Sequence, residues 1–271
     1  MPSSIIPSIA ITTTTPANRT ARPDVSIEVN RFFTAVGVAL LSAGMLWLLY
    51  LALEPYVRKF WPMTLVTWSR LLAGNFVDPQ VGRDVLLGTL FGVAIVLIPR
   101  LNVPIRGLIG LPTLPPQVPN LPELEGMRPV IAILAQLVFN SLFNSLWIVF
   151  ALVVINLIVR RVWITALIMT LFLMITSAGS IAEEPPIWYS TIVALLIVSL
   201  MVVVLFRFGL LAAATLFFVD FALATSVPTL DASKWFFPPS AGVLIFVAAL
   251  AAYGFYASRG GEPLLGKRLL E

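Results

Sequence analysis

Long apolar stretches limit the possible folds of this chain more than any other feature of its sequence. Several approach or exceed the length of about 20 residues that a helix needs to cross the hydrocarbon core of a bilayer. Hydrophobic residues make up 59% of the chain and charged residues 11%, whereas about a quarter of a soluble domain is charged. The sequence therefore predicts an all-α, polytopic membrane protein.

The apolar stretches predict about seven transmembrane helices in one bundle. The second stretch is short, and the sequence leaves open whether it spans fully, although an extension back through Arg83 would lengthen it. Arg160 and Arg161 separate the third stretch from the fourth and predict a tight helical hairpin. We expect a flexible arm over residues 1–31 and a membrane domain over residues 32–271. The predicted helices cover residues 32–53, 85–98, 130–159, 162–178, 187–206, 208–225 and 241–256.

Basic residues near the helix ends predict the orientation of the bundle. Lys and Arg accumulate on the cytoplasmic side of membrane proteins. Their larger share falls on the side that holds residues 54–84 and the Arg160–Arg161 turn, whereas Glu183 and Glu184 mark the other side. We therefore expect the N-terminus outside and the C-terminus in the cytoplasm, in the inner (cytoplasmic) membrane of a bacterium.

The composition excludes several kinds of chemistry. The chain contains no cysteine and no histidine, so disulfides, thiol nucleophiles, Cys/His metal sites and His-ligated haem are ruled out. No motif for a carboxylate metal site or a serine nucleophile is present, and we predict no catalytic, cofactor-binding or metal-binding residues. The basic residues are scattered at helix ends, which does not favour nucleic-acid binding.

The stretch between the first two predicted helices, Leu53–Asp84, is unusually polar and aromatic for this chain. We expect part of it to form an amphipathic helix in the headgroup plane, because Pro62 suits a first helical turn and tryptophans favour the interface. The apolar positions recur at steps of three and four residues: Leu65, Trp68, Leu72 and Phe76.

This stretch is also a candidate docking surface for a protein partner at the cytoplasmic face. The alternative is an interfacial helix that only anchors the loop. The acids and arginines are close enough in sequence to permit local ion pairs. The candidate residues are Glu54, Arg58, Trp61, Trp68, Arg70, Asp78, Arg83 and Asp84.

A second candidate site lies inside the predicted bundle. Gln136, Asn140 and Asn144 are spaced by four residues and form one polar stripe along a helix, while Asp220 is an acid well inside a predicted span. Polar groups in hydrocarbon mark either hydrogen bonds between helices or a path for a ligand or ion. Both interpretations stay open, and an acid without a basic partner is weak support for a proton relay.

Several motifs resemble the C-terminal membrane region of a group of bacterial serine/threonine protein kinases. The stretch "LEPYVRKFWPMTLVTWSRLLAGNFVDPQVGRD" is similar to a pattern that follows a membrane span in those kinases. The resemblance continues in "LEGMRPV", "RRVWITAL", "FRFGLLA" and "LAAYGFYASRGGEPLLG". It implies a shared membrane module, for which we expect a role as an anchor or a sensor.

The chain departs from those kinases because it carries no kinase domain. A Gly-rich phosphate loop and a "DFG" motif are missing, and without histidine the catalytic "HRD" is impossible. We therefore expect a non-catalytic integral membrane module that acts as an anchor, sensor or accessory subunit. The alternatives are a small transporter or channel component and a structural subunit of a larger membrane complex.

Overall fold

The described part of the chain is almost entirely helical, as expected. The computed structural model describes residues 25–60, 62–111, 128–226, 233 and 237–260. The helices are α1 (Val25–Phe60), α2 (Pro62–Leu72), α3 (Pro79–Leu108), α4 (Arg128–Val159), α5 (Val162–Thr176), α6 (Ala178–Ala182), α7 (Ile187–Thr225) and α8 (Phe237–Ser258).

Five helical segments of the described residues are long and apolar enough to cross a bilayer, which confirms a multi-pass membrane architecture. Two further segments that the sequence predicted as spans are shorter apolar helices, Val162–Thr176 and Leu210–Thr225. The five long segments are Phe32–Val57, Pro79–Leu108, Leu134–Val159, Ile187–Phe208 and Ser240–Ser258.

The second membrane helix is much longer than its predicted range of 85–98. It begins at Pro79, where the Asp78 carboxylate caps the helix by accepting a hydrogen bond from the Gln80 backbone N–H at 2.8 Å. It continues through Pro99 and Pro104 to Leu108. The predicted range ends directly before Pro99, and a proline usually stops a helix. Within a membrane helix prolines are better tolerated, because neighbouring groups compensate the lost backbone bond.

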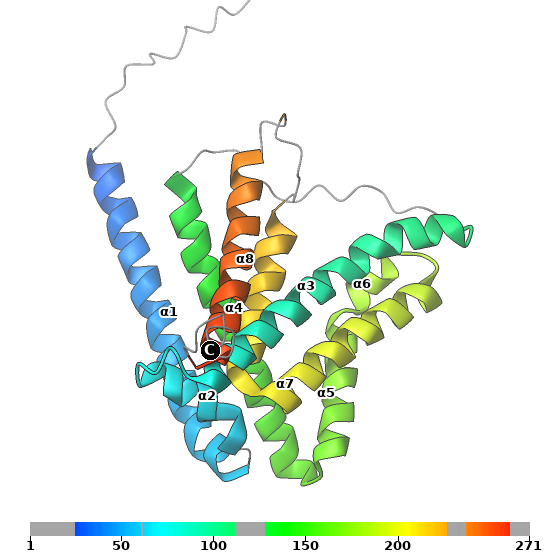
Figure 1. Cartoon of the computed structure of the whole chain (residues 1–271), viewed down its shortest axis with the longest axis horizontal. Coiled ribbons are helices and arrows are strands. Elements are labelled where there is room, and N and C mark those ends of the chain that lie inside the picture. Colours follow the sequence, from blue (N-terminus) through cyan, green and yellow to red (C-terminus); the bar gives the residue numbers. More distant parts are fainter. Residues whose placement is uncertain (1–24, 61, 112–127, 227–232, 234–236, 261–271) are drawn as a thin grey trace, which may run out of the picture. The chain divides into compact units, whose positions relative to one another are not determined.

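Two sharp reversals connect neighbouring helices almost directly. At the first, Arg160 has a φ of 55° and separates α4 from α5, which confirms the predicted tight hairpin. At the second, α7 breaks at Gly209, whose φ of 87° and ψ of −168° are not helical. Only glycine occupies that backbone region without strain. Figure 1 shows α7 bending at this point, between its yellow and gold parts.

Close packing through glycines places α3 against α7 and α8 (Figure 1). A Cβ on Gly88 would lie 2.5 Å from the Ala212 carbonyl oxygen, and one on Gly92 would lie 2.8 Å from the Leu216 carbonyl oxygen. Small residues let membrane helices approach to backbone contact. The second half of α7 is consequently buried over residues 210–219.

The chain divides into two compact units, residues 1–43 and residues 44–271, and helix α1 has residues in both. Helix α1 begins at Val25, inside the segment predicted as an arm, and continues past Pro55 to Phe60. Residues Glu54–Phe60, predicted as loop, are therefore helical. In the second unit Leu53 and Val57 are buried in the main apolar core.

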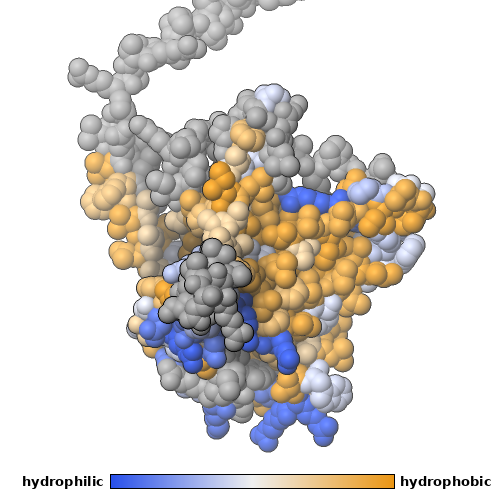
Figure 2. Space-filling view, viewed as in Figure 1, coloured by the Kyte–Doolittle hydropathy of each residue, from blue (hydrophilic) through white to orange (hydrophobic). Residues whose placement is uncertain are grey.

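The surface of the second unit is divided by polarity. Figure 2 shows an apolar face over α3, α5 and α7, with hydrophilic residues beside α2 and at the reversal between α4 and α5. Exposed side chains such as Leu90, Leu167 and Leu171 contribute to the apolar surface. Large apolar side chains exposed in this way suit contact with lipid.

Candidate functional site

Helix α2 and the connection after it fold onto the bundle. Trp68 is partly buried and packs against two apolar core clusters, while Thr67 is 5% exposed. Beyond the helix, the Tyr253 hydroxyl of α8 donates a hydrogen bond to the Phe76 carbonyl oxygen at 2.7 Å. The side chains of Leu72 and Phe76 point outward and are exposed by 63% and 55%. This corner, residues 66–84, is a structured element with an apolar outer surface.

An ion pair joins the two ends of the connection. The Arg70 guanidinium lies 2.7 Å from the Asp78 carboxylate, which also caps α3. Desolvation favours a higher pKa for Asp78, but the hydrogen bonds from the Gln80 N–H and from Arg70 outweigh it and hold that pKa below its ordinary value. The sequence predicted such local pairs, and the structure places Arg70 with Asp78 and Arg83 with Asp84.

A cavity of about 250 Å³ lies where α2, the start of α3 and the break in α7 meet. Asp84 is 1% exposed at its wall, and its Oδ1 accepts from the Arg83 guanidinium at 3.2 Å. Gly209 places the break in α7 at the same wall. The lining residues are Val66, Thr67, Gln80, Arg83, Asp84, Phe206, Arg207, Phe208 and Gly209.

Arg207 is a member of this cavity that the sequence interpretation missed as a site residue. It was read only as a separator between two spans. Its side chain is exposed, and among the described residues no hydrogen bond or ion pair is recorded for it. A lone arginine two residues before a glycine, between two apolar segments, was the available signal for a functional break.

The structure describes the other residues of the predicted docking surface only in part. Glu54 is partly exposed near the end of α1. Trp61 lies outside the described residues, and so does the side chain of Arg58. The structure thus gathers Arg70, Asp78, Arg83 and Asp84 at the α2–α3 corner, with Trp68 turned toward the core.

The predicted polar stripe on α4 makes bonds within its own helix. The Asn144 side-chain amide donates to the Asn140 carbonyl oxygen at 2.8 Å, and Gln136 is exposed. No hydrogen bond from the stripe to Asp220 is recorded among the described residues. The structure therefore does not bring the two halves of this candidate site together through hydrogen bonds.

Asp220 has a basic neighbour that the sequence interpretation missed. Arg100 on α3 lies close enough for the two opposite charges to attract each other. Its Nη2 also donates to the Leu223 carbonyl oxygen at 2.8 Å. Arg100 was counted as part of a loop after a proline, whereas the continuation of α3 through Pro99 carries it beside α7.

A second polar cavity, of about 210 Å³, lies among α3, α6 and the first half of α7. Asn102 is 3% exposed at its wall, and its Oδ1 has no hydrogen-bond partner among the described residues. One turn further along α3, the fully buried Arg106 donates to the Pro185 carbonyl oxygen and lies 5.4 Å from the centre of the Tyr189 ring. The sequence interpretation missed Asn102 and Arg106 because, like Arg100, they lie in the part of α3 beyond the predicted end of the second helix.

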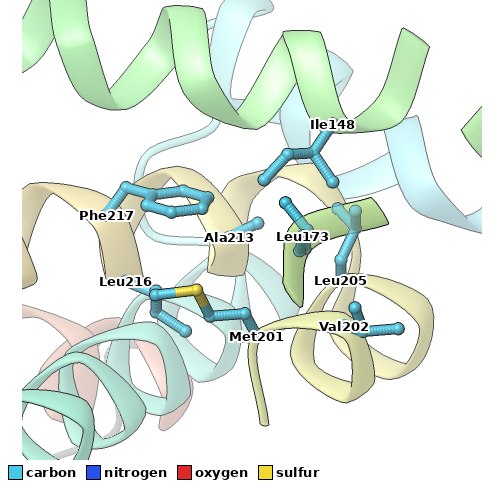
Figure 3. A pocket seen from close by; sticks show the side chains of 8 residues that line it. All are labelled: Ile148, Leu173, Met201, Val202, Leu205, Ala213, Leu216 and Phe217. Atoms are coloured by element: carbon cyan, nitrogen blue, oxygen red, sulfur yellow. The ribbon is translucent and has the colours of Figure 1, made fainter. Parts of the chain in front are cut away.

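A further cavity among the described residues is apolar and small. Its volume is about 10 Å³, roughly the space that a single water needs. Figure 3 shows that aliphatic and aromatic side chains from α4, α5 and both halves of α7 surround it, including Ile148, Leu173 and Phe217. A void of this size and polarity is a packing defect and does not bind a ligand.

No group of three or more acidic side chains that could hold a metal ion occurs among the described residues. Comparison with models of protein families, with curated proteins and with solved structures gives no match. The resemblance to the kinase membrane region therefore stays a prediction from the sequence motifs.

Proposed function

We propose that this protein is a non-catalytic integral membrane module that docks a protein partner through the α2–α3 corner, as an anchor, sensor or accessory subunit. One observation carries this proposal: the corner is held in place by the bond from Tyr253 and the Arg70–Asp78 pair, yet it presents Leu72 and Phe76 outward. A linker between two membrane helices needs no such ordering. The sequence motifs that resemble those of the bacterial kinases cover the same corner.

The proposal includes a placement in the membrane. All seven apolar helices cross, with the N-terminus outside and the C-terminus in the cytoplasm of a bacterial cell. Helix α2 lies in the headgroup plane, and the corner faces the cytoplasm because basic residues favour that side. The second half of α7 is short for a crossing helix, but residues 210–219 are covered by protein, so its length need not match the lipid.

Site-specific photocrosslinking in native membranes tests the docking role. A photoreactive residue at Leu72 is expected to capture one defined protein band, and the same residue at Leu90, a similarly exposed leucine on the lipid-facing side of α3, is the matched control. Arg70→Ala is expected to reduce the capture at Leu72. If position 72 captures only lipid, α2 is an interfacial anchor and the docking role is wrong.

The second candidate function, a small transporter or channel component, is favoured by the Arg100–Asp220 pair. Charged side chains inside a bundle mark ion and substrate paths in many membrane proteins. Reconstitution into liposomes with a pH-sensitive dye and a potassium gradient measures ion flux directly. A flux that Asp220→Asn abolishes, with the fold intact, would favour this function over docking.

A further inference from the structure

The cavity at the break in α7 carries an excess of positive charge. Its described lining residues include two arginines, Arg83 and Arg207, and a single acid, Asp84. The recorded bonds between Arg83 and Asp84 use the Arg83 Nε and Nη2 atoms and a single carboxylate oxygen. No described residue forms a hydrogen bond or an ion pair with Arg207, so none of the described acids compensates its charge at the cavity wall.

The backbone around Gly209 adds to the positive potential. The second half of α7 begins at Leu210, directly after the glycine that lines the cavity. The N-terminal end of a helix carries a partial positive charge, and interrupted membrane helices use that end to hold anionic groups. Gln80 and Thr67 add polar side chains to the same wall.

We infer that this cavity binds a phosphate group. Arginine recognises phosphate oxygens through paired N–H donors, and two arginines beside a helix start suit an anion with several acceptor oxygens. The volume of about 250 Å³ is several times the ~30 Å³ share of a water molecule, which leaves room for a phosphate with its adjoining glycerol.

The phosphate can come from an anionic phospholipid headgroup or from solution. Phe206 and Phe208 flank Arg207 at the wall, and the cavity opens beside apolar helices. Basic pockets between membrane helices bind lipid headgroups in this way. This inference goes beyond the docking role and does not depend on it, because it concerns the purified chain alone.

Thermal unfolding of the purified protein in detergent tests the inference. The added probes are dihexanoyl phosphatidylglycerol, dihexanoylglycerol without a phosphate, and inorganic phosphate. Phosphatidylglycerol is expected to raise the unfolding midpoint, because a ligand of the folded state stabilises it. In Arg207→Gln the apparent affinity is expected to fall about tenfold, the effect of losing one hydrogen bond to a charged group. Arg161→Gln, at the reversal between α4 and α5, is the matched control and should keep the full response.

Each outcome of this experiment bears on the inference. A response to phosphatidylglycerol alone assigns the site to a lipid headgroup, and an equal response to inorganic phosphate assigns it to a soluble phosphate. An equal response to dihexanoylglycerol overturns the inference, and so does an absence of any response or an equal loss in Arg161→Gln. If Arg207→Gln does not fold, Arg83→Gln is measured instead, and its unchanged affinity would overturn the inference. Photocrosslinking at Leu72 reports on partner docking separately.

Discussion

The Arg100 guanidinium on α3 donates a hydrogen bond to the Leu223 carbonyl oxygen on α7 and attracts the Asp220 carboxylate on the same helix. The hydrogen bond joins Arg100 to the backbone of α7, and the attraction acts on a charge three residues earlier along the same helix. Arg100 thereby joins the end of the second membrane helix to the interrupted helix at the centre of the bundle.

The first prediction concerns the Arg100–Asp220 pair. Asp220→Asn should keep the fold, because the amide retains shape and hydrogen-bonding capacity, whereas Asp220→Leu should destabilise by about 1 kcal/mol, in the range of polar contacts within membrane helices. Unfolding in mixed detergent micelles measures both. In a double-mutant cycle with Arg100→Gln, a coupling free energy of about 0.5 kcal/mol or more is expected if the two opposite charges stabilise each other. Fully additive effects would show that the pair does not act as a unit.

The second prediction concerns the close approach of α3 to α7. Gly92→Ala should destabilise the bundle by about 1–3 kcal/mol, the usual cost of overpacking, because its Cβ would meet the Leu216 carbonyl oxygen at 2.8 Å. Gly107→Ala on the same helix is the control, since nothing lies within 4 Å of its new Cβ. Equal stability of the two variants would contradict the described packing.

The sequence predicted most of the helices because apolar length is a strong signal in a membrane protein. It misplaced the end of the second helix, since the rule that proline stops a helix is derived from water-exposed backbone. That single error removed Arg100, Asn102 and Arg106 from the predicted site, and it made Asp220 look isolated. Which glycine contacts which helix was likewise not predictable, because sequence spacing does not identify the facing helix.

The third prediction concerns the break in α7. Gly209→Ala should cost about 1–3 kcal/mol, because a φ of 87° with a ψ of −168° is a backbone region that side chains with a Cβ scarcely enter. Gly179→Ala in α6, where nothing lies within 4 Å of the new Cβ, is the control. Thermal unfolding in detergent compares the two variants. An unaltered midpoint in Gly209→Ala would mean that α7 runs straight through this position.

The fourth prediction concerns the Asp78 cap and its pH dependence. Asp78→Ala should destabilise by about 1 kcal/mol through loss of the cap, whereas Asp78→Asn keeps a capping side chain without the charge. The folded-state pKa of Asp78 lies below its ordinary value of 3.8. The stabilisation that the ionised Asp78 gives to the folded state is therefore fully present above pH 3.8 and is lost as the pH falls through the lower folded-state pKa. The stability difference between wild type and Asp78→Asn should therefore shrink below pH 3.8. A difference that grows on acidification would contradict the assigned sign.

The candidate site at the α2–α3 corner was predictable in part. Charge density identified Arg70, Asp78, Arg83 and Asp84, and the structure confirms that these residues form local pairs. Helical spacing placed Trp68 and Leu72 on one apolar stripe of an interfacial helix, yet Trp68 packs inward and Leu72 faces outward. A single amphipathic stripe cannot distinguish the side of α2 that faces the bundle from the side that faces lipid or a partner.

The last prediction decides whether α5 crosses the membrane. Its 15 residues give a helix of about 23 Å at ~1.5 Å per residue, shorter than the ~30 Å hydrocarbon core of a bilayer, so a crossing requires local thinning of the lipid. The chain contains no cysteine, which makes single cysteines at Arg161 and Glu183 clean reporters of the two ends. With seven crossings, a membrane-impermeant maleimide should label Arg161→Cys only from the cytoplasm and Glu183→Cys only from outside. Labelling of both positions from the same side would show that α5 turns back within the membrane, which would leave the chain with fewer than seven crossings.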